Sequence, residues 1–181
     1  MSPPSPVVHL ADLALEEQRH GESFAAGLAS LTAGTGARHL GARLAVVPPG
    51  KRAWPYHCHH ANDELFVILA GEGTLRLGDV AHPFRAGDVL VCPAGGAATA
   101  HAITNTGEAA LSYLAVSSMR EPDVMEYPDS GKWGAFAGAA PGGPKGERSF
   151  AAFVTTDARR GYWDGEDRRT ARAVVFARSR P

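Results

Sequence analysis

Residues 57–77 read His-Cys-His-His-Ala-Asn-Asp-Glu-Leu-Phe-Val-Ile-Leu-Ala-Gly-Glu-Gly-Thr-Leu-Arg-Leu. The stretch holds two short apolar runs, Glu64–Leu69 and Thr74–Leu77, on either side of a Gly-rich sequence. Runs of this length are shorter than a typical helix, and glycine supplies the positive φ that tight turns need. We therefore expect a β-hairpin here, with a two-residue turn at Gly71-Glu72.

Four further apolar runs of similar length surround this stretch: Leu44–Val47, Asp88–Cys92, His101–Thr104 and Leu111–Val116. Gly and Pro separate the runs, and the 181 residues include 21 glycines and 13 prolines. Short strands between such turn residues are typical of an antiparallel sandwich or barrel. We predict an all-β barrel over residues 40–117. Residues 1–39 form an N-terminal extension with a short helix over Asp12–Gln18, and residues 118–181 a loop-rich C-terminal extension with a final strand over Thr170–Arg178.

Composition excludes several classes of protein. The net charge of −1 provides no basic field for nucleic acid, and no apolar run approaches the roughly 20 residues that span a membrane. The first residues lack the pattern of a secretory signal. Two cysteines, Cys58 and Cys92, are too few for a disulfide framework. We expect a cytoplasmic protein without nucleic-acid or membrane partners.

The run Glu64–Leu69 is apolar on both of its faces. Phe66 and Ile68 share one face, which we assign to the barrel interior. Leu65, Val67 and Leu69 share the other face, which needs cover from the terminal extensions or from a second subunit. We therefore predict a homodimer.

Histidines gather immediately before this run. His57, His59 and His60 fall within four residues, and His101 lies on another expected strand. Residues two apart in a strand share a face, so His57 and His59 point the same way and His60 points oppositely. Glu64 opens its run on the interior face. Imidazole and carboxylate groups from separate strands of a barrel suit a divalent transition metal.

The spacing of these residues resembles the two signature motifs of the cupin superfamily. The first motif is matched by Gly50, His57, His59, Glu64 and Gly71, and the second by Gly87, Pro93, Gly95, His101 and Asn105. The resemblance implies a double-stranded β-helix, also called a cupin or jelly-roll barrel. It implies a metal held by His57, His59, Glu64 and His101. Asn105 is then structural, and His60 either points outward or lies behind the metal ligands. Asp63 is the alternative to Glu64 if the turn differs by one residue.

The whole chain also resembles small bacterial single-domain cupins that are described as sugar-phosphate-isomerase-like, through segments such as Gly71–Gly78 and Glu126–Lys132. This resemblance implies an enzyme that acts on a polar small molecule such as a sugar or sugar phosphate. A metal-dependent dioxygenase and a non-catalytic small-ligand-binding cupin are the alternatives. Iron, manganese, nickel, cobalt and zinc all tolerate the four ligands.

No residue is assigned a catalytic role from the sequence. Tyr56, Tyr113 and Lys51 are candidates for acid–base chemistry by their place in the sequence, but a structural role is the favoured interpretation of each. A phosphate group would need cations, for which the candidates are Lys51, Arg52 and Lys132. A solvated surface is the favoured interpretation of these three residues as well.

Overall fold

The computed structural model describes residues 6–166, and nearly all of its regular structure is β-strand. Its strands are β1 (Glu16–His20), β2 (Phe24–Ser30), β3 (Gly41–Val47), β4 (Cys58–His59), β5 (Glu64–Ala70), β6 (Glu72–Leu77), β7 (Val80–Arg85), β8 (Val89–Cys92), β9 (His101–Thr104), β10 (Leu111–Ser117), β11 (Asp123–Tyr127), β12 (Lys132–Ala137) and β13 (Phe150–Thr155). The 3₁₀ helices are η1 (Leu10–Asp12), η2 (Ala97–Thr99), η3 (Pro128–Ser130), η4 (Lys145–Glu147) and η5 (Thr156–Ala158). No helix within residues 6–166 has the length and apolar character needed to cross a membrane. The predicted all-β class is confirmed.

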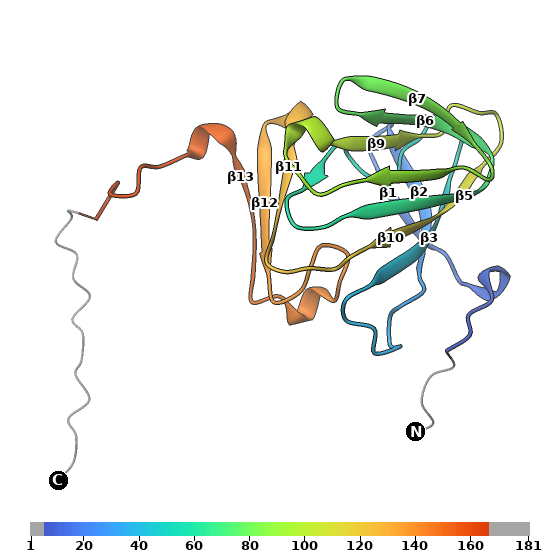
Figure 1. Ribbon diagram of the computed structural model, residues 1–181, viewed down its shortest axis with the longest axis horizontal. Coiled ribbons are helices and arrows are strands. Elements are labelled where there is room, and N and C mark those ends of the chain that lie inside the picture. The colour runs from blue at the N-terminus through green and yellow to red at the C-terminus, as the bar shows by residue number, and fades with distance from the viewer. Residues whose placement is uncertain (1–5, 167–181) are drawn as a thin grey trace, which may run out of the picture.

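Two antiparallel sheets enclose the main core (Figure 1). One has the order β1-β2-β3-β10-β5-β8, and the other has the order β7-β6-β9. Side chains from both sheets meet in a single cluster, which includes Phe66, Ile68 and Tyr113 from the larger sheet and Leu75 and Ile103 from the smaller one. The predicted barrel is therefore present, and the six apolar runs that predicted it lie in strands, except that Asp88 precedes β8.

The expected hairpin between the runs Glu64–Leu69 and Thr74–Leu77 is wrong. β5 pairs with β10 and β8, whereas β6 pairs with β7 and β9. The chain changes sheets at Gly71, whose φ is +83° and whose added Cβ would lie 2.8 Å from the Ala110 carbonyl oxygen. The inward-facing residues of β5 and β6 consequently pack against each other across the core. A hairpin would have buried the same alternating residues of both strands.

The N-terminal extension contains strands where a helix was expected. Residues 12–18 lie partly in η1 and partly in β1, which pairs with β2. Strand β2 pairs in turn with β3, so this segment widens the large barrel sheet. Pairing with an open sheet edge has overridden the local helix propensity of Asp12–Gln18.

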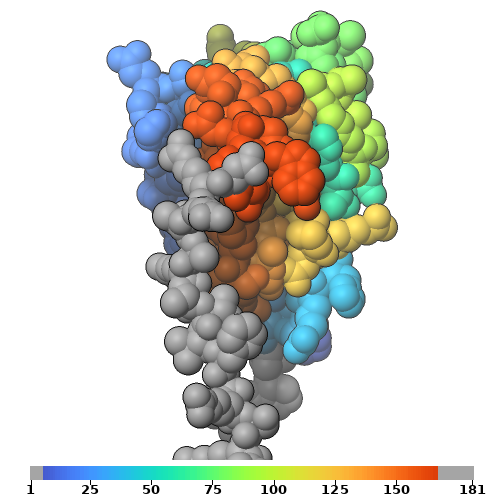
Figure 2. All heavy atoms as spheres, turned by 90° about the vertical axis from the view of Figure 1, so that its left-hand side faces the viewer, coloured from blue at the N-terminus to red at the C-terminus, as the bar shows by residue number. Residues whose placement is uncertain are grey.

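A third sheet closes one end of the barrel, where sequence analysis expected loops. It has the order β13-β12-β11-β4, and we call it the end sheet. In Figure 1 its strands stand across the barrel strands, and Figure 2 views the molecule from this end. Strand β12 contains a glycine, Gly134, where two aromatic rings pack closely against the backbone. A Cβ at this position would lie 2.8 Å from the Phe153 ring and 2.9 Å from the Phe136 ring, so a larger residue would collide with them. The final strand expected over Thr170–Arg178 lies outside the described residues.

The outer face of β5 and β8 is apolar and accessible. Leu69, Val89 and Val91 are 40%, 52% and 60% exposed. Leu65 pairs with Val91 and Val67 with Val89, so these side chains form one continuous surface. The homodimer that this face led us to expect stays a prediction.

Candidate metal centre

Three histidines surround the carboxylate of Glu64. Their Nε2 atoms lie 2.9 Å (His101), 3.6 Å (His59) and 3.9 Å (His57) from Oε2 of Glu64. All three imidazoles are buried, and the Glu64 side chain is 16% exposed. The structure thus brings together the four residues from which we expected a metal site.

Backbone pairing holds these residues in place. His57 precedes β4 and forms an isolated antiparallel bridge with His101, the first residue of β9. The His57 amide donates to the His101 carbonyl at 3.1 Å, and the His101 amide donates back at 2.7 Å. His59 lies in β4, where its carbonyl accepts a hydrogen bond from the Gly95 amide at 2.8 Å. Glu64 begins β5, so each of the four side chains is anchored near a strand end.

The other ring nitrogen of each histidine faces an acceptor. Nδ1 of His57 lies 2.8 Å from the Pro55 carbonyl oxygen, and Nδ1 of His101 lies 3.4 Å from the Thr99 carbonyl oxygen. Nδ1 of His59 lies 2.6 Å from Oδ2 of Asp123. For His57 and His59 these acceptors favour the tautomer with hydrogen on Nδ1, which leaves a lone pair on Nε2 directed at Glu64. His101 instead donates its Nε2 hydrogen to Oε2 of Glu64 at 2.9 Å.

This donor arrangement fits a bound cation. Imidazole lone pairs and an ionised carboxylate repel one another unless a positive charge lies between them. Burial lowers the pKa of His57 to about 4, aided by the nearby His101. Burial alone would raise the pKa of Glu64, but the hydrogen bond with His101 and the charges of the three histidines outweigh it and set that pKa to about 2. A neutral imidazole and an ionised carboxylate are the forms that bind metals.

Asp123 also belongs to this site, although no pattern in the sequence predicts it. It comes from β11 of the end sheet, is fully buried, and also accepts a hydrogen bond from the Ala61 amide at 3.0 Å. Burial alone would raise its pKa, but hydrogen bonds led by the one from His59 lower it. The sequence carries no motif for Asp123, because it lies 64 residues from His59. Its role depends on how the end sheet packs on the barrel.

We expect Asp123→Asn to weaken binding of Mn²⁺ by about 10- to 100-fold, because carboxylates behind metal-bound histidines orient the ring and raise its basicity. Isothermal titration calorimetry of the two proteins measures the change. Asp129→Asn is the matched control, because Asp129 pairs with Arg76 on the exterior of the same region. Equal Mn²⁺ affinity of Asp123→Asn and wild type would contradict this role.

Two nearby residues lie where the sequence predicted. His60 points away from the four-residue cluster, toward Glu126. Asn105 is structural, since it donates hydrogen bonds to the Val47 and Ala109 carbonyls. Asp63, the alternative to Glu64, instead accepts a hydrogen bond from the Ala94 amide.

Of the three expected cations, Lys132 is connected to the four-residue cluster through the ring of Tyr127. Its Nζ sits 4.7 Å above the Tyr127 ring, and that ring stacks on His57 at 5.9 Å. Lys51 instead donates to the Glu22 carbonyl at 2.6 Å, and Arg52 lies over Phe24, so both contact the N-terminal strands.

The two tyrosines considered for acid–base chemistry have structural surroundings. The Tyr56 hydroxyl donates to the Gly78 carbonyl, and its ring carries the Arg76 guanidinium at 3.6 Å. Tyr113 is fully buried in the barrel core, and its hydroxyl has no hydrogen-bond partner within residues 6–166. Burial raises the pKa of Tyr113 strongly, so its hydroxyl stays protonated.

Comparison with known proteins identifies the barrel. Residues 43–117 match the cupin domain family. An oxalate-binding protein from Thermotoga maritima is 37% identical over 83 residues, which are 44% of this chain and 65% of that protein. The chain thus spans slightly less than two thirds of this curated relative.

Two solved structures resemble most of the chain. A proposed sugar phosphate isomerase from Acidithiobacillus ferrooxidans has a TM-score of 0.71 and 26% identity, and the match covers 86% of this chain and 96% of that one. A sugar phosphate isomerase of the cupin superfamily from Silicibacter pomeroyi has a TM-score of 0.68 and 21% identity, over 88% of this chain and 98% of that one. The second similarity concerns the fold alone.

Proposed function

This chain carries a cupin domain, and we propose that the domain is a metal-dependent enzyme acting on a sugar or sugar phosphate. His57, His59, Glu64 and His101 would hold one divalent transition metal. The observation that carries the proposal is the convergence of three Nε2 atoms on Glu64, with every Nδ1 facing an acceptor. Such a metal, when bound, supplies a Lewis acid that polarises a carbonyl or hydroxyl oxygen.

The chain's own residues would orient the ligands and exclude water. Asp123 sets the His59 ring, and the backbone carbonyls of Pro55 and Thr99 set the other two. Tyr127 covers His57 from the end sheet and is itself buried. Lys132 lies over Tyr127 and provides a positive charge for an anionic group such as phosphate.

Two observations support the substrate class. The solved structure from A. ferrooxidans, which matches 86% of this chain, is described as a proposed sugar phosphate isomerase. A 1,2-hydroxycarbonyl compound also offers two neighbouring oxygens, which match a metal that keeps open positions beside four protein ligands.

A non-catalytic binding protein is the second candidate, and the 37% identity to an oxalate-binding protein favours it. Oxalate is a small chelating dianion that presents the same pair of neighbouring oxygens. In addition, the side chains that contact the four-residue cluster within the described residues, such as Asp123 and Tyr127, are already hydrogen-bonded.

The test is a turnover and binding screen of the full chain loaded with Mn²⁺ or Co²⁺. Isomerisation of a sugar phosphate in D₂O exchanges the proton beside the carbonyl, which NMR detects. We expect exchange with at least one sugar phosphate, and a loss of about 100-fold or more in Glu64→Gln, because that change removes a charged ligand. Glu108→Gln, at an exposed position, is the control.

Two outcomes would contradict the isomerase proposal. Oxalate binding without exchange of any sugar phosphate would favour the binding protein. Undiminished exchange in Glu64→Gln, with metal retained, would remove the assigned site from the reaction.

A further inference from the structure

Strand β4 presents a second group of metal-binding side chains on its opposite face. Cys58 and His60 alternate with His57 and His59, so they point away from the first cluster. Cys58 lies opposite Glu126 in the register of β4 and β11, which puts their side chains on one face. The Cys58 sulfur, a ring nitrogen of His60 and a carboxylate oxygen of Glu126 all lie within 4.8 Å of one another.

The distances within this group suit a metal better than direct hydrogen bonding. Nε2 of His60 and Oε2 of Glu126 are 3.6 Å apart, which exceeds the usual length of a hydrogen bond. In tetrahedral zinc sites, metal–nitrogen and metal–oxygen bonds place the two donor atoms about 3.4 Å apart. The His60 and Glu126 donor atoms are therefore already spaced as two ligands of one ion would be, with the Cys58 sulfur within 4.8 Å of the group.

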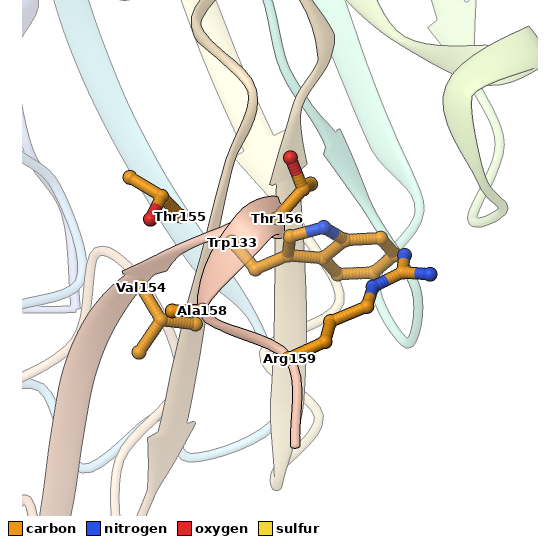
Figure 3. Close-up of a pocket in the computed structure, with 6 residues that line it drawn as sticks. All are labelled: Trp133, Val154, Thr155, Thr156, Ala158 and Arg159. Carbon is orange, nitrogen blue, oxygen red and sulfur yellow. The ribbon is translucent and has the colours of Figure 1, made fainter. Parts of the chain in front are cut away.

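The end sheet gives the group a built environment. Trp133 lies opposite Glu126 on β12, and its ring stacks on His60 at 5.4 Å with an interplanar angle of 29°. The Trp133 Nε1 is buried and has no hydrogen-bond partner within the described residues. The same tryptophan forms one wall of a cavity of about 340 Å³, whose other lining residues include Thr156 and Arg159 (Figure 3).

Access to the group comes from one side. Cys58 is fully buried, but the side chains of Glu126 and His60 are 19% and 38% exposed. Gly96 borders them, and an added Cβ there would lie 3.9 Å from the His60 ring. Two of the three donor side chains, those of His60 and Glu126, are therefore partly open to solvent.

We propose that Cys58, His60 and Glu126 form a second metal site, for a thiophilic divalent ion such as Zn²⁺. One sulfur, one nitrogen and one oxygen donor favour zinc or cobalt over manganese or magnesium, which prefer oxygen. Three protein ligands leave a fourth tetrahedral position for water or another ligand. On binding, the Cys58 thiol releases its proton to solvent and its sulfur forms the bond to the metal, with no change of oxidation state.

The two sites use different residues but share strand β4. The second site does not rest on the proposed function, because none of its three residues belongs to the four-residue cluster. A metal bound to Cys58 and His60 would hold the strand that positions His57 and His59. The sites are therefore distinguishable by mutation.

Cobalt spectroscopy tests the second site, because thiolate bound to Co²⁺ gives a near-ultraviolet charge-transfer band that nitrogen and oxygen ligands do not give. We expect the wild-type chain to show this band on titration with Co²⁺. The band should persist in His57→Ala/His59→Ala and disappear in Cys58→Ala. Elemental analysis after Zn²⁺ loading and desalting should give two ions per chain for wild type and one for Cys58→Ala.

Cys92→Ala is the matched control, because Cys92 is the other buried cysteine and lies opposite Glu64 on β8. Its band and its zinc content should equal those of wild type. His60→Ala provides a second variant at a partly exposed position, with the same expected loss of one zinc ion. Absence of the band in wild type, its loss in Cys92→Ala, or two zinc ions in His60→Ala would each overturn the proposal.

Discussion

The variant His57→Ala/His59→Ala will bind Mn²⁺ at least about 100-fold more weakly than wild type. Two of the four side chains around the site disappear, and even residues behind metal ligands are worth about 10- to 100-fold in affinity. Mn²⁺ is the appropriate ion because it avoids thiolate ligands, so Cys58 contributes nothing to the measurement. Electron paramagnetic resonance of free Mn²⁺ during titration gives both affinity and stoichiometry.

The control for this experiment is His39→Ala/His82→Ala, which removes two exposed imidazoles. It should bind one Mn²⁺ with the wild-type affinity. Circular dichroism of both variants establishes that the strands remain. One Mn²⁺ bound with unchanged affinity to His57→Ala/His59→Ala would exclude the two histidines as ligands.

Asn105→Ala will lower the free energy of unfolding by about 3 kcal/mol. The side chain is completely buried, donates to the Val47 and Ala109 carbonyls at 2.8 and 2.9 Å, and accepts from the Gly107 amide at 3.0 Å. Alanine leaves three backbone groups without this partner, at about 1 kcal/mol each. For a chain of this length the melting temperature should fall by about 6–12 °C.

Urea unfolding followed by fluorescence measures this loss. Thr106→Ala is the control, because the Thr106 hydroxyl forms its hydrogen bond with the Thr74 hydroxyl at an exposed position. Its effect should stay within about 0.5 kcal/mol. A stability of Asn105→Ala equal to that of Thr106→Ala would show that solvent replaces the hydrogen bonds of Asn105.

The barrel strands were predictable because their signal is local. Each inward-facing series, such as Phe66 and Ile68, alternates with outward residues over a few positions, and Gly or Pro follows closely after most of the runs. Strands β11 and β12 lack so clear a signal. In β11 the buried residues Asp123, Met125 and Tyr127 alternate correctly, but the first of them is charged, so the apolar pattern is interrupted.

Strand pairing was not predictable in the same way. The segment around Gly71 has the composition of a hairpin turn, yet β5 and β6 join different sheets. Alternation specifies which face of a strand is buried, but a hairpin and a change of sheet bury the same face. The choice depends on the strands that arrive later in the chain, including β8, β9 and β10.

By itself, the sequence determined an all-β barrel and the group of His57, His59, Glu64 and His101, because short-range alternation and motif spacing carry both. Only the tertiary structure placed Asp123 behind His59, and Glu126 beside Cys58 and His60. Both carboxylates come from β11, more than 60 residues along the chain from their partners. Contacts between segments so far apart arise from sheet packing, which short-range patterns do not encode.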